Sequence, residues 1–190
     1  MRITGGRIGG QVIKVPRGSH VRPTQERVRE ALFSSLGEGM VGSAVLDCYA
    51  GSGALGIEAW SRGAASVEWV EQDGRVFKWL KENVTRLCGA GPAATCHKSD
   101  VAVFLTRSPK ECYDFILADP PYERHSVPFD SAAFLARVCA SRCLRSGGVL
   151  VLEQRASQEA AQHQEWRLLR DKVYGETRLV FYTQKSNDVP

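Results

Sequence analysis

The side chains best suited to chemistry in this sequence lie in the run Asp119-Pro120-Pro121-Tyr122. The run follows the apolar residues 115–118, which are typical of a buried strand. Proline fixes φ and lacks an N–H group, and a residue before proline avoids the helical region, so a stiff loop is expected after this strand. The carboxylate and the Pro120 carbonyl can accept the hydrogens of an exocyclic NH2 group, while Tyr122 stacks on the ring that carries it. A rigid structural turn without a ligand is the alternative.

A glycine loop at 47–56 forms the second group of candidate residues. Its glycines allow a tight turn and close approach of a ligand to bare backbone. In an open α/β sheet such a loop lies at the carboxyl ends of the strands, where ligands bind. Because Gly51-x-Gly53-x-x-Gly56 also matches the dinucleotide fingerprint, a nicotinamide enzyme is an alternative.

Asp47 favours S-adenosylmethionine as the ligand of this loop, and two further acidic residues could bind its nucleoside. Asp47 would repel a pyrophosphate and attract the ammonium group of S-adenosylmethionine. Glu71 ends a second expected strand and can accept hydrogen bonds from both ribose hydroxyls. Asp100 can bind the adenine amino group, or it can cap the helix that follows it. The expected cofactor-binding residues are Asp47, Tyr49, Ala50, Gly51, Ser52, Gly53, Glu71, Gln72, Asp100 and Val101.

The two groups together predict methyl transfer to an exocyclic amine of a nucleobase. The strand that ends at Asp119 is expected beside the strand that ends near Asp47, so the two loops would face each other across a crevice. Hydrogen bonds to Asp119 and Pro120 favour a tetrahedral nitrogen whose lone pair points at the methyl group, and in-line positioning lowers the barrier. A base in this pocket must be unstacked from its helix or loop. Asp119, Pro120 and Tyr122 are therefore the expected catalytic residues.

Alternating strands and helices are expected to position these loops. The apolar pattern predicts strands at 44–49, 66–70, 93–97, 114–118 and 148–153, and helices at 54–62, 74–88, 101–107 and 130–144. A further helix opens at Pro23-Thr24, with Thr24 as its cap, and strands at 166–174 and 177–183 close the chain as a hairpin. Repeated βα units imply an α/β fold with a mostly parallel sheet covered on both faces. The predicted organisation is a basic N-terminal β arm or hairpin (1–21), one domain (22–185) and a flexible tail (186–190).

Composition limits the partners and the compartment. Of the 190 residues, 43% are hydrophobic and 24% are charged, and no stretch reaches the roughly 18 apolar residues of a membrane span. The start of the chain lacks the apolar core of a signal peptide, so a cytoplasmic protein is expected. Residues 1–30 carry a charge of +5, against +4 for the whole chain. A basic arm on a near-neutral body predicts a polyanionic partner, and a solvated surface hairpin is the alternative.

The cysteines and histidines indicate neither disulfides nor a metal. There is no Cys-x-x-Cys pair, and the four histidines show no ligand spacing. Reduced and mostly buried thiols are expected. Cys139 and Cys143, four residues apart, are expected to share a helix face.

Nearly end to end, the chain resembles the bacterial RsmD family of 16S ribosomal RNA guanine-N2 methyltransferases. The resemblance is carried by Ile3-Thr4-Gly5-Gly6, Arg22-Pro23-Thr24, Arg27-Val28-Arg29-Glu30, the glycine loop, Ser61-Arg62-Gly63-Ala64, Asp119-Pro120-Pro121-Tyr122 and Tyr174-Gly175-Glu176-Thr177. It implies a class I, Rossmann-like methyltransferase fold with a seven-stranded sheet, and S-adenosylmethionine as donor. The implied substrate is the guanine at position 966 of 16S rRNA, in the small ribosomal subunit or its assembly intermediate. Arg22, Thr24, Arg27, Arg29 and Pro121 are the residues expected at the RNA.

Several alternatives stay open at this point. Adenine N6, cytosine N4 and guanine N2 all offer an NH2 group, and only the resemblance selects guanine. A DNA adenine-N6 methyltransferase would share the Asp-Pro-Pro-Tyr run, and an rRNA-binding assembly factor without catalysis would share the basic arm. Arg22 and Thr24 could contact either cofactor or RNA, and Arg27 and Arg29 could instead form ion pairs with Glu26 or Glu30. A monomer is expected.

Overall fold

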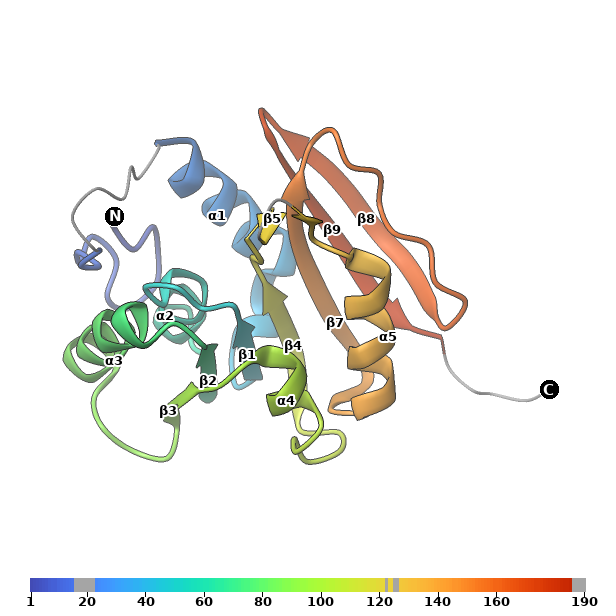
Figure 1. The fold of residues 1–190 in the computed structure, drawn as a ribbon. Coiled ribbons are helices and arrows are strands. Elements are labelled where there is room, and N and C mark those ends of the chain that lie inside the picture. The colour runs from blue at the N-terminus through green and yellow to red at the C-terminus, as the bar shows by residue number, and fades with distance from the viewer. Residues whose placement is uncertain (16–22, 122, 125–126, 186–190) are drawn as a thin grey trace.

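In the computed structural model, which describes residues 1–15, 23–121, 123–124 and 127–185, a seven-stranded sheet runs through the centre of the molecule (Figure 1). Its strands are β1 (Ala44–Cys48), β2 (Ser66–Glu71), β3 (Ala94–Lys98), β4 (Tyr113–Ala118), β7 (Leu144–Arg155), β8 (Trp166–Tyr174) and β9 (Thr177–Gln184). Their order across the sheet is β3-β2-β1-β4-β7-β9-β8. The first five are parallel, and β9 runs antiparallel to both β7 and β8. The predicted mostly parallel sheet with a closing antiparallel hairpin is confirmed, as is the neighbouring position of β1 and β4.

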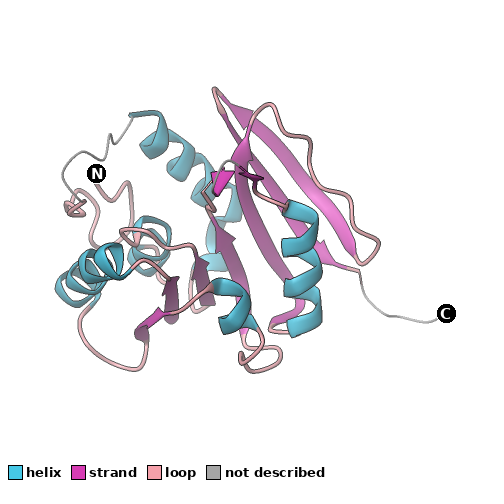
Figure 2. Ribbon diagram, in the orientation of Figure 1, coloured by secondary structure: helices cyan, strands magenta, loops and turns pink. Residues whose placement is uncertain are grey.

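Helices cover both faces of the sheet (Figure 2). The helical segments are α1 (Pro23–Leu36), a 3-10 turn η1 (Gly37–Met40), α2 (Ala54–Ser61), α3 (Gly74–Cys88), α4 (Val101–Leu105) and α5 (Ser131–Ser141), and a short hairpin β5 (Glu123–Arg124) and β6 (Val127–Pro128) follows β4. The strands divide their side chains between two cores because successive residues point to opposite faces. On β4, Leu117 packs with α1, α2 and α3, whereas Ile116 packs with α4 and α5.

Three local predictions differ from the structure. Helix α1 begins at Pro23, so Thr24 lies in its first turn rather than at its cap, because the fixed φ of proline suits the first helical position. Helix α5 ends at Ser141 and is followed by Arg142 in the left-handed region (φ 54°), so Cys139 and Cys143 do not share a helix face. All six cysteines are free thiols, but only Cys48 and Cys143 are fully buried.

Strand β7 is longer than predicted and begins at Leu144. The turn-like run 146–148 continues the strand through an irregular register against β4, with Gly147 at φ 74°. No helix in the described part of the chain is long and apolar enough to cross a membrane.

The N-terminal segment, residues 1–15, packs against the domain. Its strand-like pairing is a single antiparallel bridge between Arg2 and Val12. Ile3 and Ile13 are 2% and 1% exposed and belong to the core under α2 and α3. The division of the chain at residue 21 stays a prediction, but the described part of the arm shares a core with the rest.

The backbone of this segment approaches α2 closely at Gly6. Gly6 has φ 77°, and a Cβ atom there would lie 2.1 Å from the carbonyl oxygen of Ser61. Only glycine fits that contact, which gives a physical reason for a glycine in the Ile3–Gly6 motif.

Candidate active site

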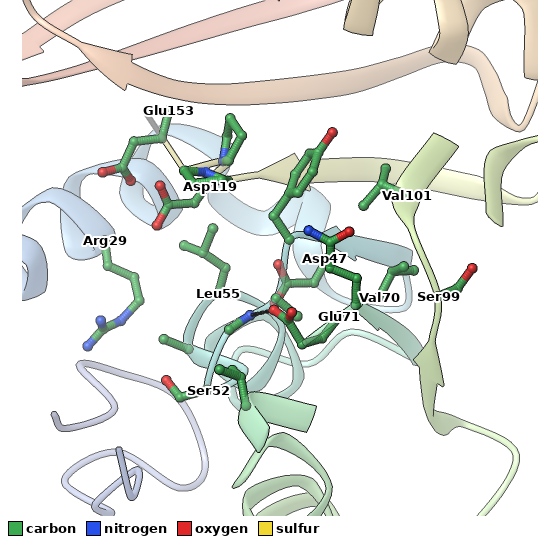
Figure 3. A pocket seen from close by; sticks show the side chains of 18 of the residues that line it. Arg29, Asp47, Ser52, Leu55, Val70, Glu71, Ser99, Val101, Asp119 and Glu153 are labelled. Carbon is green, nitrogen blue, oxygen red and sulfur yellow. Dashed lines mark hydrogen bonds between the residues drawn. The ribbon is translucent and has the colours of Figure 1, made fainter. Parts of the chain in front are cut away.

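A pocket of about 550 Å³ opens at the carboxyl ends of β1, β2, β4 and β7 (Figure 3). It is lined by Met1, Arg29, Asp47, Tyr49, Ala50, Gly51, Ser52, Ala54, Leu55, Val70, Glu71, Gln72, Val76, Ser99, Val101, Asp119, Pro120, Pro121 and Glu153. This position is where ligands bind in open α/β sheets, and the volume lies in the range of small-molecule sites.

Most of the residues predicted to act lie together in this pocket. Those that line it are Arg29, Asp47, Tyr49, Ala50, Gly51, Ser52, Glu71, Gln72, Val101, Asp119, Pro120 and Pro121. Gly53 is buried beneath it, and Asp100 lines a neighbouring pocket of about 220 Å³ that also contacts Tyr49 and Gln72. Arg27 is exposed on α1 and away from the pocket lining. Arg22 and Tyr122 lie outside the described residues, and for Thr24 only the backbone, within α1, is described.

The glycine loop turns sharply enough to expose backbone to the pocket. Tyr49, Gly51 and Gly53 all have positive φ, at 60°, 56° and 91°. A non-glycine residue in this conformation is strained, and the Tyr49 ring is held by edge and tilted contacts with Phe129 and Phe134 at 5.6 and 5.8 Å between centroids. The Gly51 amide donates to Glu71 Oε2 at 3.0 Å, which joins the loop to the end of β2.

Asp47 is buried beneath the loop. Its carboxylate Oδ2 accepts a hydrogen bond from the Gly56 amide at 2.8 Å, and the residue is 1% exposed. Burial, reinforced by the nearby carboxylates of Asp119 and Glu71, raises the pKa of Asp47 to about 8, against the opposing effect of the Gly56 hydrogen bond. At neutral pH the carboxyl is therefore largely protonated until a cation approaches it.

This raised pKa predicts how stability changes with pH. The folded protein holds a proton on Asp47 that the unfolded chain releases. The contribution of Asp47 to the free energy of unfolding is therefore fully present below pH ~4 and is lost as the pH rises through 8. We expect the free energy of unfolding of the ligand-free protein to fall between about pH 5 and 8, and Asp47→Asn to flatten this dependence. Urea unfolding across that range measures it. A variant with the same slope as the wild type would contradict the assignment.

Other carboxyl groups do not obscure this test. The pKa of Glu68 is lowered by its bond to His97, and that of Asp114 by its bonds to the Ala44 amide and Arg145. Groups with a lowered pKa reduce the free energy of unfolding only toward acid pH. Enclosure by the pocket walls raises the pKa of Asp119 to about 6, in the same direction as for Asp47. Because the pKa of Asp119 rises less than that of Asp47, we expect the larger contribution from Asp47.

Glu71 and Asp100 differ in how their carboxylate oxygens are already hydrogen-bonded within the protein. Glu71 Oε1 accepts from the Asp73 amide at 2.7 Å, so backbone hydrogen bonds fix both oxygens while each keeps a second lone pair. Asp100 Oδ1 caps α4 through the amides of Ala102 and Val103 at 2.8 and 3.3 Å. Of the two readings of Asp100, the helix cap is the one present in the structure.

Arg29 occupies a different place from the one expected. Its side chain is 4% exposed, and its Nε pairs with Glu58 Oε2 at 3.2 Å. It also donates to the Arg2 carbonyl and to Met1 Sδ. The alternative ion pair of Arg29, with Glu26 or Glu30, is wrong, because its partner is Glu58; the contact with RNA stays a prediction. Arg29 reaches the pocket wall instead of the outer surface.

Glu58 is the buried centre of this arrangement. The side chain is 0% exposed and accepts five hydrogen bonds. Thr4 donates through its amide at 2.8 Å and its hydroxyl at 2.7 Å, and Gly5 donates at 2.9 Å. Arg62 Nε adds a contact at 2.9 Å. One carboxylate therefore connects the N-terminal segment, α1 and α2 beside the pocket.

Seven lining residues were not predicted: Met1, Ala54, Leu55, Val70, Val76, Ser99 and Glu153. For Glu153 a signal was present, since it ends the apolar run 149–152 just as Asp119 ends the run 115–118. Met1 had no such signal, because only the tertiary fold brings it to the pocket. Among the described residues, no group of three or more His, Cys, Asp or Glu side chains is arranged to hold a metal ion.

The geometry places the glycine loop, Asp119 and Pro120 around one cavity. The end of β2 adds a second fixed carboxylate. Such a site can hold a ligand with several donor groups on one side and an amine on the other.

Comparison with known proteins gives one family and several similar chains. Residues 1–183 match the family model described as Conserved hypothetical protein 95. The Escherichia coli (strain K12) protein named Ribosomal RNA small subunit methyltransferase D is 40% identical over 124 residues, which are 65% of this chain and 61% of that protein. The chain thus aligns with less than two thirds of that relative's length.

Two solved structures extend the comparison. A structure described as a putative methyltransferase yhhF from Escherichia coli superposes with a TM-score of 0.83 and 31% identity, covering 98% of this chain and 99% of that one. The T. thermophilus 16S rRNA N2 G1207 methyltransferase (RsmC), in complex with AdoMet and guanosine, gives a TM-score of 0.67 and 29% identity. It covers 94% of this chain and 46% of its own.

Proposed function

Since this chain belongs to the RsmD family, whose model is described as Conserved hypothetical protein 95, we propose that it methylates the N2 amine of a guanine in 16S rRNA. The proposed position is 966, and S-adenosylmethionine is the donor. The observation that carries the proposal is the single pocket in which Asp119 and Pro120 face the glycine loop and Glu71. The relatives' names and the guanosine and AdoMet in the T. thermophilus structure support it.

The residues of the pocket fit S-adenosylmethionine. The loop backbone at 50–52 is open to the cavity, and Glu71 keeps lone pairs for ribose hydroxyls. Asp47 is the acidic group expected near the ammonium, which would favour its ionised form over the protonated one. Tyr49, Gln72 and Val101 supply flat and apolar walls suited to a nucleoside. Asp100 caps α4 through Oδ1, and its bond to the adenine amino group stays part of the proposal.

When bound, S-adenosylmethionine supplies a methyl group on a positively charged sulfur. The protein's part is to hold the guanine amine in line with that carbon. Asp119 and the Pro120 carbonyl accept hydrogen bonds from the two N–H groups of the amine, which leaves the nitrogen lone pair available for attack. The amine becomes acidic only as the new bond forms, so Asp119 can receive the proton late. Tyr122 is proposed to stack on the base, which contributes roughly 1–3 kcal/mol.

A basic N-terminal region is proposed to bind rRNA phosphates. Arg27 is exposed there, and Arg22 belongs to the same predicted set. Arg29 is better assigned to the pocket wall, given its ion pair with Glu58. The protein is proposed to act as a monomer in the cytoplasm, where small subunits assemble.

The test is transfer of labelled methyl groups to small-subunit particles that lack the modification. We expect incorporation at one guanine N2, mapped by mass spectrometry of nuclease fragments, and none with particles already modified. Absence of incorporation by the wild-type protein would overturn the proposal. Transfer to naked duplex DNA would favour the adenine-N6 alternative, and particle binding without transfer would favour the assembly factor.

A further inference from the structure

We propose that Glu153 selects guanine by accepting its ring N1–H, while Asp119 and Pro120 hold the N2 amine. The inference rests on the proposed function and assigns the base specificity that the Asp-Pro-Pro-Tyr run leaves open. Glu153 lies on β7, whereas the Asp-Pro-Pro-Tyr run follows β4, so the run does not itself assign a role to Glu153.

The sheet brings the two carboxylates to the same edge. Strands β4 and β7 are parallel neighbours, with Ala118 opposite Leu152, and Asp119 and Glu153 are the next residues along. Neighbouring strands lie about 4.8 Å apart, so the two side chains start from adjacent points. Both line the pocket, and Figure 3 shows their carboxylates extending to the same side.

The two side chains also lie on the same face of the sheet. Leu117 and Val151 are paired in register, and both belong to the core under α1, α2 and α3. Because side chains alternate along a strand, the residues two positions later point to that face as well. These are Asp119 and Glu153, and Arg29 lines the pocket from α1 on that side.

Two adjacent acceptors complement the hydrogen-bonding edge of guanine but not those of adenine and cytosine. Guanine carries a ring N1–H next to its N2 amine, so its edge presents two neighbouring donors. Adenine and cytosine carry an unprotonated ring nitrogen next to the amine, and that lone pair would face the Glu153 carboxylate. A lone pair held against a carboxylate is repelled, so such a base is rejected much more strongly than one that differs in shape alone.

The experiment compares guanine with 2-aminopurine at the target position of reconstituted particles. 2-Aminopurine keeps the amine at C2 but has an acceptor at N1 and no O6 carbonyl, so the comparison with Glu153→Gln, which changes only the partner of N1, isolates the proposed contact. We expect wild-type kcat/KM to favour guanine by about 100-fold or more. Glu153→Gln can donate its amide to N1, and we expect it to reduce the guanine preference at least about tenfold.

Further variants separate selection from stability. Glu153→Asp keeps a carboxylate and should retain a preference for guanine, whereas Glu159→Gln, on the exposed loop before β8, should behave as wild type. S-Adenosylmethionine affinity, measured by calorimetry, should be unchanged in Glu153→Gln. An unchanged guanine preference in Glu153→Gln, with an active wild type, would overturn the role of Glu153 alone. A wild-type protein that methylates no guanine would overturn the proposed function itself.

Discussion

Replacing Asp119 with alanine is expected to lower kcat for methyl transfer by about 100-fold or more, because the amine loses one of its two acceptors and its alignment. S-Adenosylmethionine should still bind, since Asp119 raises the pKa of Asp47 and its removal eases ionisation there. Single-turnover transfer to undermethylated particles measures the chemical step, and calorimetry measures donor binding. A loss confined to KM would instead indicate that Asp119 serves only to bind RNA.

The conservative variant sharpens this test. Asp119→Asn keeps one carbonyl acceptor at the same place and removes the charge. It should retain more activity than alanine if hydrogen bonding to the amine is the main effect. Equal losses in the two variants would show that the charge, through proton acceptance or electrostatics, dominates.

Replacing Glu58 with alanine is expected to destabilise the fold by roughly 3–5 kcal/mol, the usual cost of leaving a buried charge unpaired. The change removes the acceptor of Arg29 and of both donors of Thr4. Chemical denaturation of wild type and variant at one pH measures the difference in free energy of unfolding.

A matched control is available on the surface. Glu82 also pairs with a residue of the N-terminal segment, Lys14, but its side chain is 50% exposed. Glu82→Ala should therefore cost at most about 1 kcal/mol. If Glu58→Ala were as mild as Glu82→Ala, the buried carboxylate would not be holding the segment in place.

The sequence predicted the sheet well because each strand carried its own signal. Apolar runs such as 115–118 and the glycine loop identify buried parallel strands and their connections without reference to distant residues. Helix α3 matched its predicted span, 74–88, since Asp73 caps its start and Gly89, at φ 86°, follows its end. The end of α5 was missed because Arg142, which ends it in a left-handed conformation, has no glycine-like signal.

The site residues at strand ends could be predicted from the sequence, whereas those placed by tertiary contacts could not. Asp47, Glu71 and Asp119 each end or adjoin a strand, so a parallel sheet must gather them. Arg29 was assigned to RNA from its charge, although it lies three and four positions before Leu32 and Phe33, on the buried stripe of α1. Glu58 is a single acid within an apolar helix, and nothing local indicates that one of its partners, Thr4, lies 54 residues earlier.

The docking of the N-terminal segment also has a consequence for the order of folding. Thr4 finds its acceptor 54 residues later and Lys14 finds Asn83 69 residues later, so these contacts of the N-terminal segment cannot form until α2 and α3 exist. At the other end, β9 inserts between β7 and β8, and the sheet closes only with the last strand. Contacts of such long sequence separation form late and slowly. Arg29 meets its partner Glu58 only once α2 has formed, so the pocket wall that Met1 and Arg29 make is expected to be completed after the central strands.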